Sequence, residues 1–306
     1  MEFLYILEKI RVPGLNEFML LITRLGEETA FLVMALVMFW CISKRCGYYL
    51  LSVGFIGTLA NQFMKLWFRV PRPWVLDSHF TILEQAREAA SGYSFPSGHT
   101  QSAVGTFGAI AYTTKNRWVR GIAILIAVLV PFSRMYIGVH TPADVIVAAG
   151  LAVALIILLR PVVFAENDKY MPLLLGCMLV LSVGYMCFVS FYPFPVDTDV
   201  HNMESGVKNA YTLLGALIGM IVVYIVDKKW LNFSTEAVWW AQILKVIGGL
   251  LVVLAVKSGL KTPLNAMFGE SIGRSARYCL IVLVAGIVWP LTFKWFSKLG
   301  KKDNQC

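Results

Sequence analysis

Residues 119–162 decide the fold, and they read VRGIAILIAVLVPFSRMYIGVHTPADVIVAAGLAVALIILLRPV. Two long apolar runs, 119–137 and 141–162, meet at a short polar turn, where His140 lies between the runs and Asp144 lies at the start of the second. A helix needs roughly 20 apolar residues to cross the hydrocarbon core of a bilayer. Each run meets that requirement, so the stretch predicts two transmembrane helices joined at a polar turn.

The composition of the whole chain also indicates a membrane protein. Of its 306 residues, 58% are hydrophobic and only 15% are charged, whereas soluble domains carry about 45–50% apolar and about 25% charged residues. This balance excludes a disordered chain and argues against a soluble enzyme. The net charge is +9, but the basic residues lie between apolar runs, which indicates orientation in a bilayer. We therefore expect membrane lipids, and no nucleic acid, as partners.

The apolar pattern predicts an all-α, polytopic membrane helical bundle with about nine transmembrane helices. Residues 1–26 mix apolar and charged side chains, which predicts an amphipathic segment in the membrane interface, although an ordinary helix lying on the protein fits too. We expect a six-helix part over 27–194 and a three-helix extension with a short basic tail over 195–306. The expected spans are 27–43, 49–68, 98–114, 119–137, 141–162, 171–193, 206–226, 237–257 and 276–296.

Loop charges predict how the chain is oriented in a cell membrane. If nine helices alternate, 13 of the 27 Lys and Arg residues fall in loops and a tail on one side. The positive-inside rule makes that side cytoplasmic. The N-terminus is then outside, the C-terminus is cytoplasmic, and the long loop 69–97 lies on the outer face. The loop 258–275, with Lys261 and Arg274, fits this rule less well.

Three polar clusters lie at the ends of apolar runs. A charged side chain at membrane depth costs free energy, so its presence there indicates a function. With alternating helices, all three reach the outer face of the membrane. They are KLWFRVPRP at 65–73, PSGH at 96–99 and SRMYIGVHTPAD at 133–144.

The cations of these clusters describe an oxyanion site of phosphate type. Arg72 and Arg134 offer planar forks to phosphate oxygens, and Lys65 adds a point charge. Ser97 and Gly98 open a helix, whose free N–H groups favour an anion. Gly98 also lets the backbone approach a ligand closely.

The two histidines add reactive groups to this anion site. His140 and Asp144 are four residues apart, one turn of a helix, so the carboxylate can hold one ring nitrogen protonated and leave the other free to attack. His99 comes from a different helix and can donate a proton to a leaving oxygen. This combination predicts phosphoryl transfer through a phosphohistidine. No metal is needed to neutralise the phosphate, because Lys and Arg do so.

The order KxxxxxxRP, PSGH and SRxxxxxHxxxD resembles the three-part signature of the type 2 phosphatidic acid phosphatase superfamily. That superfamily includes membrane lipid phosphatases, glucose-6-phosphatase and vanadium haloperoxidases. Every signature position is occupied, the motifs span residues 65–144, and the six-helix part resembles the membrane core of the family. The resemblance implies a metal-independent enzyme without a cofactor, whose site faces away from the cytoplasm. It assigns catalysis to His140, His99 and Asp144, and phosphate binding to Lys65, Arg72, Ser97, Gly98 and Arg134.

Taken one at a time, these residues also allow ordinary roles. Thr141 and Asp144 could only start a helix, Ser97 could only cap one, and Lys65 could be an interfacial residue. The functional interpretation is favoured because all positions occur together, in one order and on one expected face.

We expect an integral membrane phosphatase that removes phosphate from a phosphorylated lipid. Candidate substrates are phosphatidic acid, sphingoid-base phosphates, prenyl phosphates or diphosphates, and phosphatidylglycerol phosphate. A lipid phosphotransferase with the same phosphohistidine, a sugar phosphatase resembling glucose-6-phosphatase and, less favoured, a non-catalytic lipid transporter are the alternatives. The extension over 206–296 could also serve as a surface for a homo-oligomer, but nothing in the sequence favours this role over others.

Overall fold

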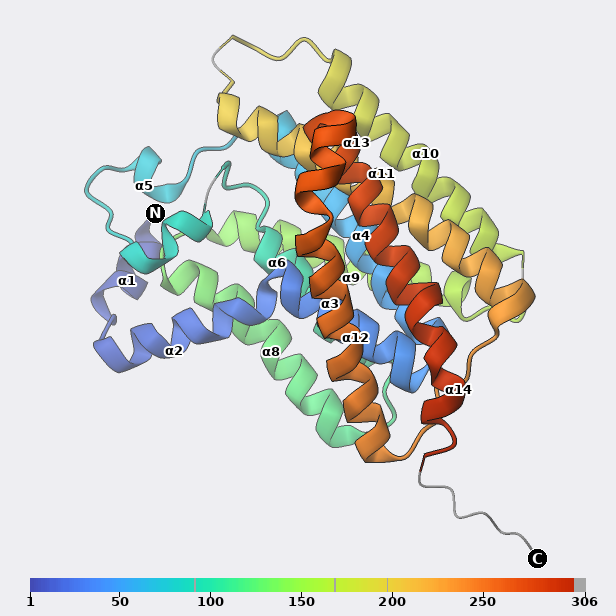
Figure 1. Cartoon of the computed structure of the whole chain (residues 1–306). Coiled ribbons are helices and arrows are strands. Elements are labelled where there is room, and N and C mark those ends of the chain that lie inside the picture. Colours follow the sequence, from blue (N-terminus) through green and yellow to red (C-terminus); the bar gives the residue numbers. More distant parts are fainter. Residues whose placement is uncertain (91, 168, 197, 300–306) are drawn as a thin grey trace, which may run out of the picture. The chain divides into compact units, whose positions relative to one another are not determined.

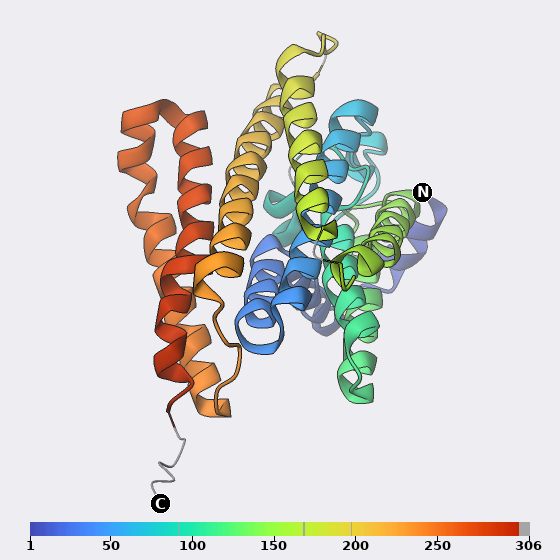
Figure 2. The ribbon, with the colours of Figure 1, turned by 90° about the vertical axis from the view of Figure 1, so that its right-hand side faces the viewer.

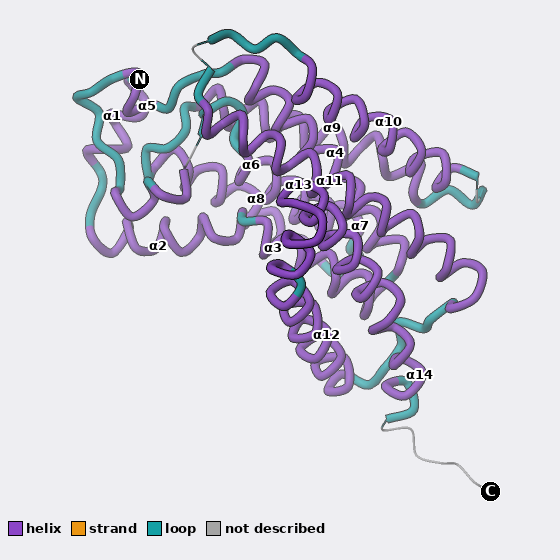
Figure 3. Tube along the Cα trace, turned by 45° about the horizontal axis from the view of Figure 1, so that its top comes forward, coloured by secondary structure: helices purple, strands orange, loops and turns teal. Residues whose placement is uncertain are grey.

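The computed structural model describes residues 1–90, 92–167, 169–196 and 198–299. Helices and loops, and no strand, make up this described part of the chain (Figure 3). The α-helices, which are labelled in Figure 1 except for α7, labelled in Figure 3, are α1 Glu2–Lys9, α2 Pro13–Thr23, α3 Glu28–Val37, α4 Lys44–Phe68, α5 Pro73–Leu76, α6 Gly98–Ala103, α7 Ala109–Thr113, α8 Arg117–Tyr136, α9 Pro142–Val163, α10 Tyr170–Phe191, α11 Val200–Val226, α12 Trp239–Gly259, α13 Lys261–Leu283 and α14 Phe293–Phe296.

These helices confirm the predicted all-α membrane class. Among the described residues, six helices, α8 to α13, are long and apolar enough to cross a bilayer. The pair Pro13–Gly26 and Glu28–Ile42 bends by 55° and counts as a seventh if it forms one span. The predicted spans at 49–68 and 98–114 are helical as well, in α4 and in the α6–α7 segment. Both carry polar side chains that line the cavity described below, which explains their lower hydropathy.

The chain folds into two compact units that interleave along the sequence. The first unit contains Met1–Met34, Tyr49–Ala165 and Pro193–Gly206. The second contains Ala35–Tyr48, Glu166–Tyr192 and the chain from Val207 onward. All of the residues singled out by the three motifs belong to the first unit.

Side-chain caps start the helices of the first unit that carry the motifs. Ser97 is the N-cap of α6, and its hydroxyl accepts a hydrogen bond from the Thr100 N–H at 3.4 Å. Thr141 and Asp144 form a reciprocal capping box at the start of α9, in which each side chain accepts from the other residue's backbone N–H. Such caps satisfy N–H groups that have no partner inside the helix.

The long loop between α4 and α6 packs on the end of α8. Ala86 and Ala90 of the loop join Tyr136, Ile137 and Val139 in a buried apolar cluster. The Leu83 N–H donates to the carbonyl of Ile137 at 3.1 Å. These contacts hold the backbone directly before His140, so the loop and α8 together place that histidine.

The second unit is built around aromatic residues and buried polar groups. The indole N–H of Trp40 donates to the carbonyl of Ala285 at 2.9 Å. The ammonium group of Lys44 contacts both carboxylate oxygens of Asp227 at 2.9 and 2.8 Å. Within this unit α12 and α13 lie side by side and run in opposite directions (Figure 2). The buried Lys245 of α12 donates to a backbone carbonyl at 3.2 Å, which explains how a mid-span lysine is accommodated.

Candidate active site

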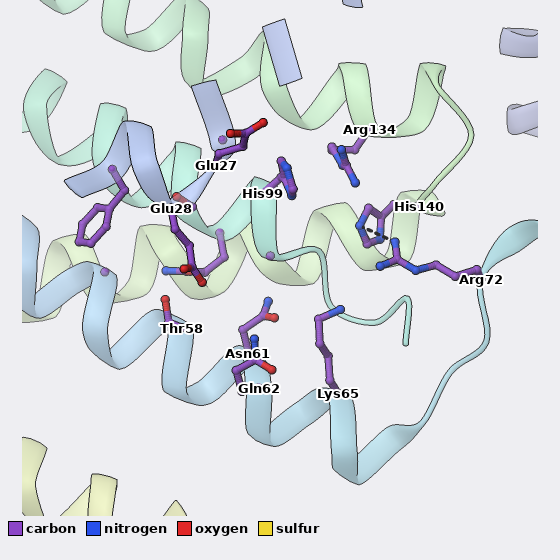
Figure 4. Close-up of a pocket in the computed structure, with 16 residues that line it drawn as sticks. Glu27, Glu28, Thr58, Asn61, Gln62, Lys65, Arg72, His99, Arg134 and His140 are labelled. Carbon is purple, nitrogen blue, oxygen red and sulfur yellow. Dashed lines mark hydrogen bonds between the residues drawn. The ribbon is translucent and has the colours of Figure 1, made fainter. Parts of the chain in front are cut away.

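A cavity of about 330 Å³ lies in the first unit, where the three motifs meet. Figure 4 shows that the labelled side chains of Lys65, His99, Arg134 and His140 converge on this space, although they come from α4, α6, α8 and the turn before α9. The cavity is lined by Gly26, Glu27, Glu28, Phe31, Gly54, Thr58, Asn61, Gln62, Lys65, Arg72, Gly98, His99, Gln101, Ser102, Arg134 and His140. The structure therefore brings together six of the eight predicted site residues as cavity wall.

His140 and Asp144 form a buried pair, as their spacing predicted. His140 is 2% exposed and Asp144 is 1% exposed. Nδ1 of the imidazole lies 3.4 Å from Oδ2 of Asp144. The same oxygen accepts hydrogen bonds from the hydroxyl of Ser94 at 2.5 Å and from the Thr141 N–H at 2.8 Å. Asp144 is thus both a helix cap and the neighbour of the histidine, so its capping role does not exclude the predicted functional one.

Arg72 holds the other side of the His140 ring. Its Nη1 lies 3.0 Å from Nε2 of His140 and donates to the carbonyl of Val139 at 2.9 Å. Its Nε donates to the carbonyl of Gly92 at 2.9 Å. A guanidinium can only donate hydrogen bonds, so Nε2 accepts and carries the lone pair, while Nδ1 carries the proton. We assign the tautomer from these partners.

Burial and nearby cations set the protonation of the residues that lie between the spans. Burial, followed by the charge of Arg72, lowers the pKa of His140 well below its usual value. Burial also lowers the pKa of Arg72 to about 10, which leaves this guanidinium charged at neutral pH. A neutral imidazole beside a charged guanidinium is the state that a nucleophile at Nε2 requires.

Lys65 and Arg134 supply two further cations at the cavity wall. The ammonium group of Lys65, in the last turn of α4, donates to the carbonyl of Tyr93 at 2.5 Å. Nη1 of Arg134 donates to the hydroxyl of Thr23 at 2.9 Å. The Nε of Arg134 is buried without a hydrogen-bond partner among the described residues. An orphaned donor in a cationic cavity fits a ligand that accepts hydrogen bonds.

Ser97 and Gly98 occupy different positions in the site although they are neighbours. Ser97 is buried, caps α6 through its hydroxyl and does not line the cavity. Its backbone N–H donates to the carbonyl of Asp144 at 3.1 Å, which ties α6 to the start of α9. Gly98 does line the cavity, and a methyl group placed on it would meet only Oδ1 of Asn61, at 3.7 Å. The room beside this glycine is therefore part of the cavity itself.

Several polar residues of the site were not identified from the sequence. Ser94 contacts the His140–Asp144 pair, and Asn61 has a buried Oδ1 without a partner among the described residues. Thr58, Gln62 and Glu28 also line the cavity, and Glu28 extends into it from the side opposite to Arg72 (Figure 4). The residues from α4 share one helical face with Lys65, because their spacing follows the helix period. A polar stripe on the expected span 49–68 was the sequence signal that could have identified the residues from α4.

Comparison with known proteins identifies relatives of both parts of the chain. Residues 45–168 match the PAP2 superfamily, and residues 211–302 match the transmembrane extension of PAP2 superfamily phosphatases. The chain is 34% identical over 164 residues to phosphatidylglycerophosphatase B of Bacillus subtilis, covering 49% of this chain and 76% of that protein. It is 25% identical over 276 residues to mouse (Mus musculus) sphingosine-1-phosphate phosphatase 1, covering 83% of this chain and 62% of that protein.

One solved structure is also similar to this chain in sequence. The crystal structure of the first transmembrane PAP2 type phosphatidylglycerolphosphate phosphatase from Bacillus subtilis is 31% identical in sequence. The match covers 54% of this chain and 84% of that chain, with a TM-score of 0.45.

Proposed function

Since this chain belongs to the PAP2 superfamily of membrane lipid phosphatases and carries their transmembrane extension, we propose that it hydrolyses a lipid phosphate monoester through a phosphohistidine at Nε2 of His140. One observation carries this proposal. Nδ1 of His140 faces Asp144, while Nε2 accepts from Arg72 at the wall of a cavity lined by three cations. The attacking nitrogen and the phosphate-binding groups therefore meet in one space.

In the first step, Lys65, Arg72 and Arg134 bind the phosphate oxygens, together with the backbone at Gly98. The lone pair on Nε2 of His140 forms a bond to phosphorus, and the bond from phosphorus to the lipid oxygen breaks. The leaving oxygen keeps the bonding pair and takes a proton from His99, which releases the lipid alcohol. The Nδ1 proton of His140 stays beside Asp144, whose charge stabilises the phosphorylated ring.

In the second step, water attacks the phosphorus atom. A new phosphorus–oxygen bond forms, the bond to Nε2 breaks, and the water proton passes to His99. Inorganic phosphate leaves, and both histidines return to their starting states. Three fixed cations oppose the charge that grows on the phosphate oxygens, so the residues of this chain supply the stabilisation that a metal supplies elsewhere.

The membrane setting supports a lipid as the substrate. A cavity at the ends of spanning helices lets a phosphate reach the histidines while the lipid chains stay in the bilayer. The loop charges support a cavity on the non-cytoplasmic face, with the C-terminus in the cytoplasm. The carboxylate of Glu28 in the cavity favours a headgroup that carries hydrogen-bond donors, such as hydroxyl or amino groups, beside its phosphate.

The decisive experiment measures phosphate release by the purified protein in detergent with EDTA present. The panel contains phosphatidic acid, phosphatidylglycerol phosphate, sphingosine phosphate, a prenyl diphosphate and glucose-6-phosphate. We expect release from at least one lipid, and none from glucose-6-phosphate. A requirement for added metal, or full activity in His140→Ala, would refute the proposed chemistry.

Rapid quenching with a ³²P-labelled substrate tests the intermediate itself. Phosphohistidine is stable in alkali and labile in acid, so the wild-type protein should carry label with that pattern. His140→Ala should carry none, and His99→Ala should lose turnover through the slower departure of the lipid alcohol. Label that moves to an added lipid alcohol instead of water would identify a phosphotransferase.

A further inference from the structure

Basic residues flank the turn between α12 and α13 and continue along α13, in the second unit, and none of them lines the catalytic cavity. Lys257 lies in the last turn of α12, Lys261 begins α13, and Arg274 and Arg277 follow along α13. The sequence predicts this turn on the non-cytoplasmic face, where the positive-inside rule gives no reason for basic residues. Arginines within a membrane segment usually mark a functional site, because an unpaired charge there is costly. The proposed phosphatase reaction uses none of these four residues.

A break in α13 brings the polar residues of this segment together. Gly269 has a φ of +77°, in the left-handed region that glycine adopts at least cost. The chain folds back at this break, so Gly273 comes close to residues that precede it. A methyl group on Gly273 would lie 2.6 Å from the carbonyl oxygen of Leu264 and 2.9 Å from the N atom of Asn265. Asn265 thus lies beside the turn that carries Arg274.

Three side chains of this segment have buried polar atoms without a hydrogen-bond partner among the described residues. They are Oδ1 of Asn265, Nε of Arg274 and Nε of Arg277. Arg277 is only 5% exposed, and its guanidinium carbon lies 5.5 Å from the centre of the Tyr278 ring. A ring contact uses the flat face of a guanidinium and leaves its N–H groups unbonded.

The segment also has too little negative charge for its cations. Nη2 of Arg274 lies 3.2 Å from Oε1 of Glu270, a pair at the surface. Neither the ion pairs nor the hydrogen bonds of the described residues give Arg277 an acceptor. A buried charge without a partner costs more free energy than a buried, hydrogen-bonded ion pair. The guanidinium of Arg277 therefore has donors to offer to an anion.

We propose that Arg274 and Arg277 bind a phosphate group in a second site, separate from the catalytic cavity. Two arginines three residues apart lie on one helix face and present several N–H donors to one oxyanion. The planar forks suit phosphate oxygens better than a spherical anion. The phosphate belongs to a membrane phospholipid headgroup or is free phosphate. The site binds this group without cleaving it, because this segment has no histidine to attack it.

Thermal unfolding of the full-length protein in detergent, with all lipid removed, tests the unpaired charge. Arg277→Met should raise the melting temperature, because it replaces a buried charge by an apolar chain of similar length. Adding phosphatidylglycerol, a phosphodiester with one anionic phosphate, should raise the melting temperature of the wild type and not of this variant. A variant that melts lower or fails to fold overturns the proposal, since Arg277 would then have a structural partner.

Binding is measured by native mass spectrometry with three probes: phosphatidylglycerol, diacylglycerol with the same chains, and inorganic phosphate. We expect Arg277→Met and Arg274→Gln to weaken phosphatidylglycerol binding at least tenfold. Arg277→Lys keeps the charge without the fork and should weaken it less. Binding of phosphatidylglycerol but not of inorganic phosphate identifies the lipid headgroup, and the reverse identifies free phosphate. Equal binding of phosphatidylglycerol and diacylglycerol, with no binding of phosphate, overturns the proposal.

Two controls separate this site from others. Arg72→Gln removes a cation from the catalytic cavity and should leave binding at the second site unchanged. Arg160→Met is a matched control, because Arg160 also lies over a ring, 5.0 Å from the centre of Tyr112, but is exposed to its surroundings. If Arg160→Met weakens phosphatidylglycerol binding as much as Arg277→Met does, binding depends on total charge and the site does not exist.

Discussion

The hydroxyl of Ser94 provides a test of how His140, the proposed nucleophile, is positioned. It donates to Oδ2 of Asp144 at 2.5 Å, and its oxygen lies 3.4 Å from Nδ1 of His140. A hydrogen bond to a charged group contributes about 1.5–3 kcal/mol. If Ser94→Ala loses this energy in the transition state, kcat falls about 10- to 150-fold, at 1.36 kcal/mol per factor of ten. KM should stay unchanged, since Ser94 does not line the cavity.

The assay is steady-state phosphate release in detergent, with kcat and KM determined separately. Ser52→Ala is the matched control, because Ser52 is as fully buried as Ser94 but its hydroxyl has no hydrogen-bond partner among the described residues. It should keep the wild-type kcat. Ser94 acts through Asp144, so the double variant Ser94→Ala with Asp144→Asn should lose less than the product of the two single losses. A wild-type kcat in Ser94→Ala, or a loss confined to KM, would refute the reasoning.

Three further outcomes follow from the cavity. Burial and Arg72 lower the pKa of His140, so its Nε2 stays unprotonated in weak acid. The apparent pKa of the acid limb of the kcat/KM pH profile should therefore lie below the usual histidine value of about 6.5. An apparent pKa at or above that value would contradict this reasoning. Gly98→Ala adds a methyl group that meets only Asn61, so thermal unfolding should show wild-type stability or a gain of up to about 1 kcal/mol. The rate of phosphate release should fall at least tenfold, and an unchanged rate would show that phosphate binds elsewhere. Glu28→Gln should lower kcat/KM for lipids whose headgroups carry hydrogen-bond donors more than it lowers kcat/KM for phosphatidic acid. An unchanged ratio of the two values would show that Glu28 does not set headgroup selectivity.

The helices were predictable because span length and hydropathy depend on local sequence. The predicted segment 141–162 corresponds to α9 at Pro142–Val163, and 171–193 to α10 at Tyr170–Phe191. The start of α4 was less accurate, at 49 instead of Lys44, because Lys44 and Arg45 are polar and do not continue the apolar run. Helix ends depend on caps and tertiary contacts as well as on hydropathy.

The site was predictable to the extent that its residues belong to motifs. Lys65, Arg72 and His140 line one cavity although they lie on different elements. Ser94 stands two residues before a motif and was missed, because its role depends on how the chain folds back onto Asp144. Glu28 could not be found from sequence patterns, since only the bend between α2 and α3 brings it into the cavity.

If His140 is the nucleophile that we propose, the double role of Asp144 makes the first turn of α9 respond to the charge on this histidine. One oxygen receives the backbone N–H of Thr141 and faces Nδ1 of His140. When the ring becomes phosphorylated or protonated, it attracts the carboxylate of Asp144. The strength of the hydrogen bond from the N–H of Thr141 to the same oxygen then changes. Hydrogen exchange at that single amide should therefore change during turnover, which makes the start of a membrane span a built-in reporter of the reaction.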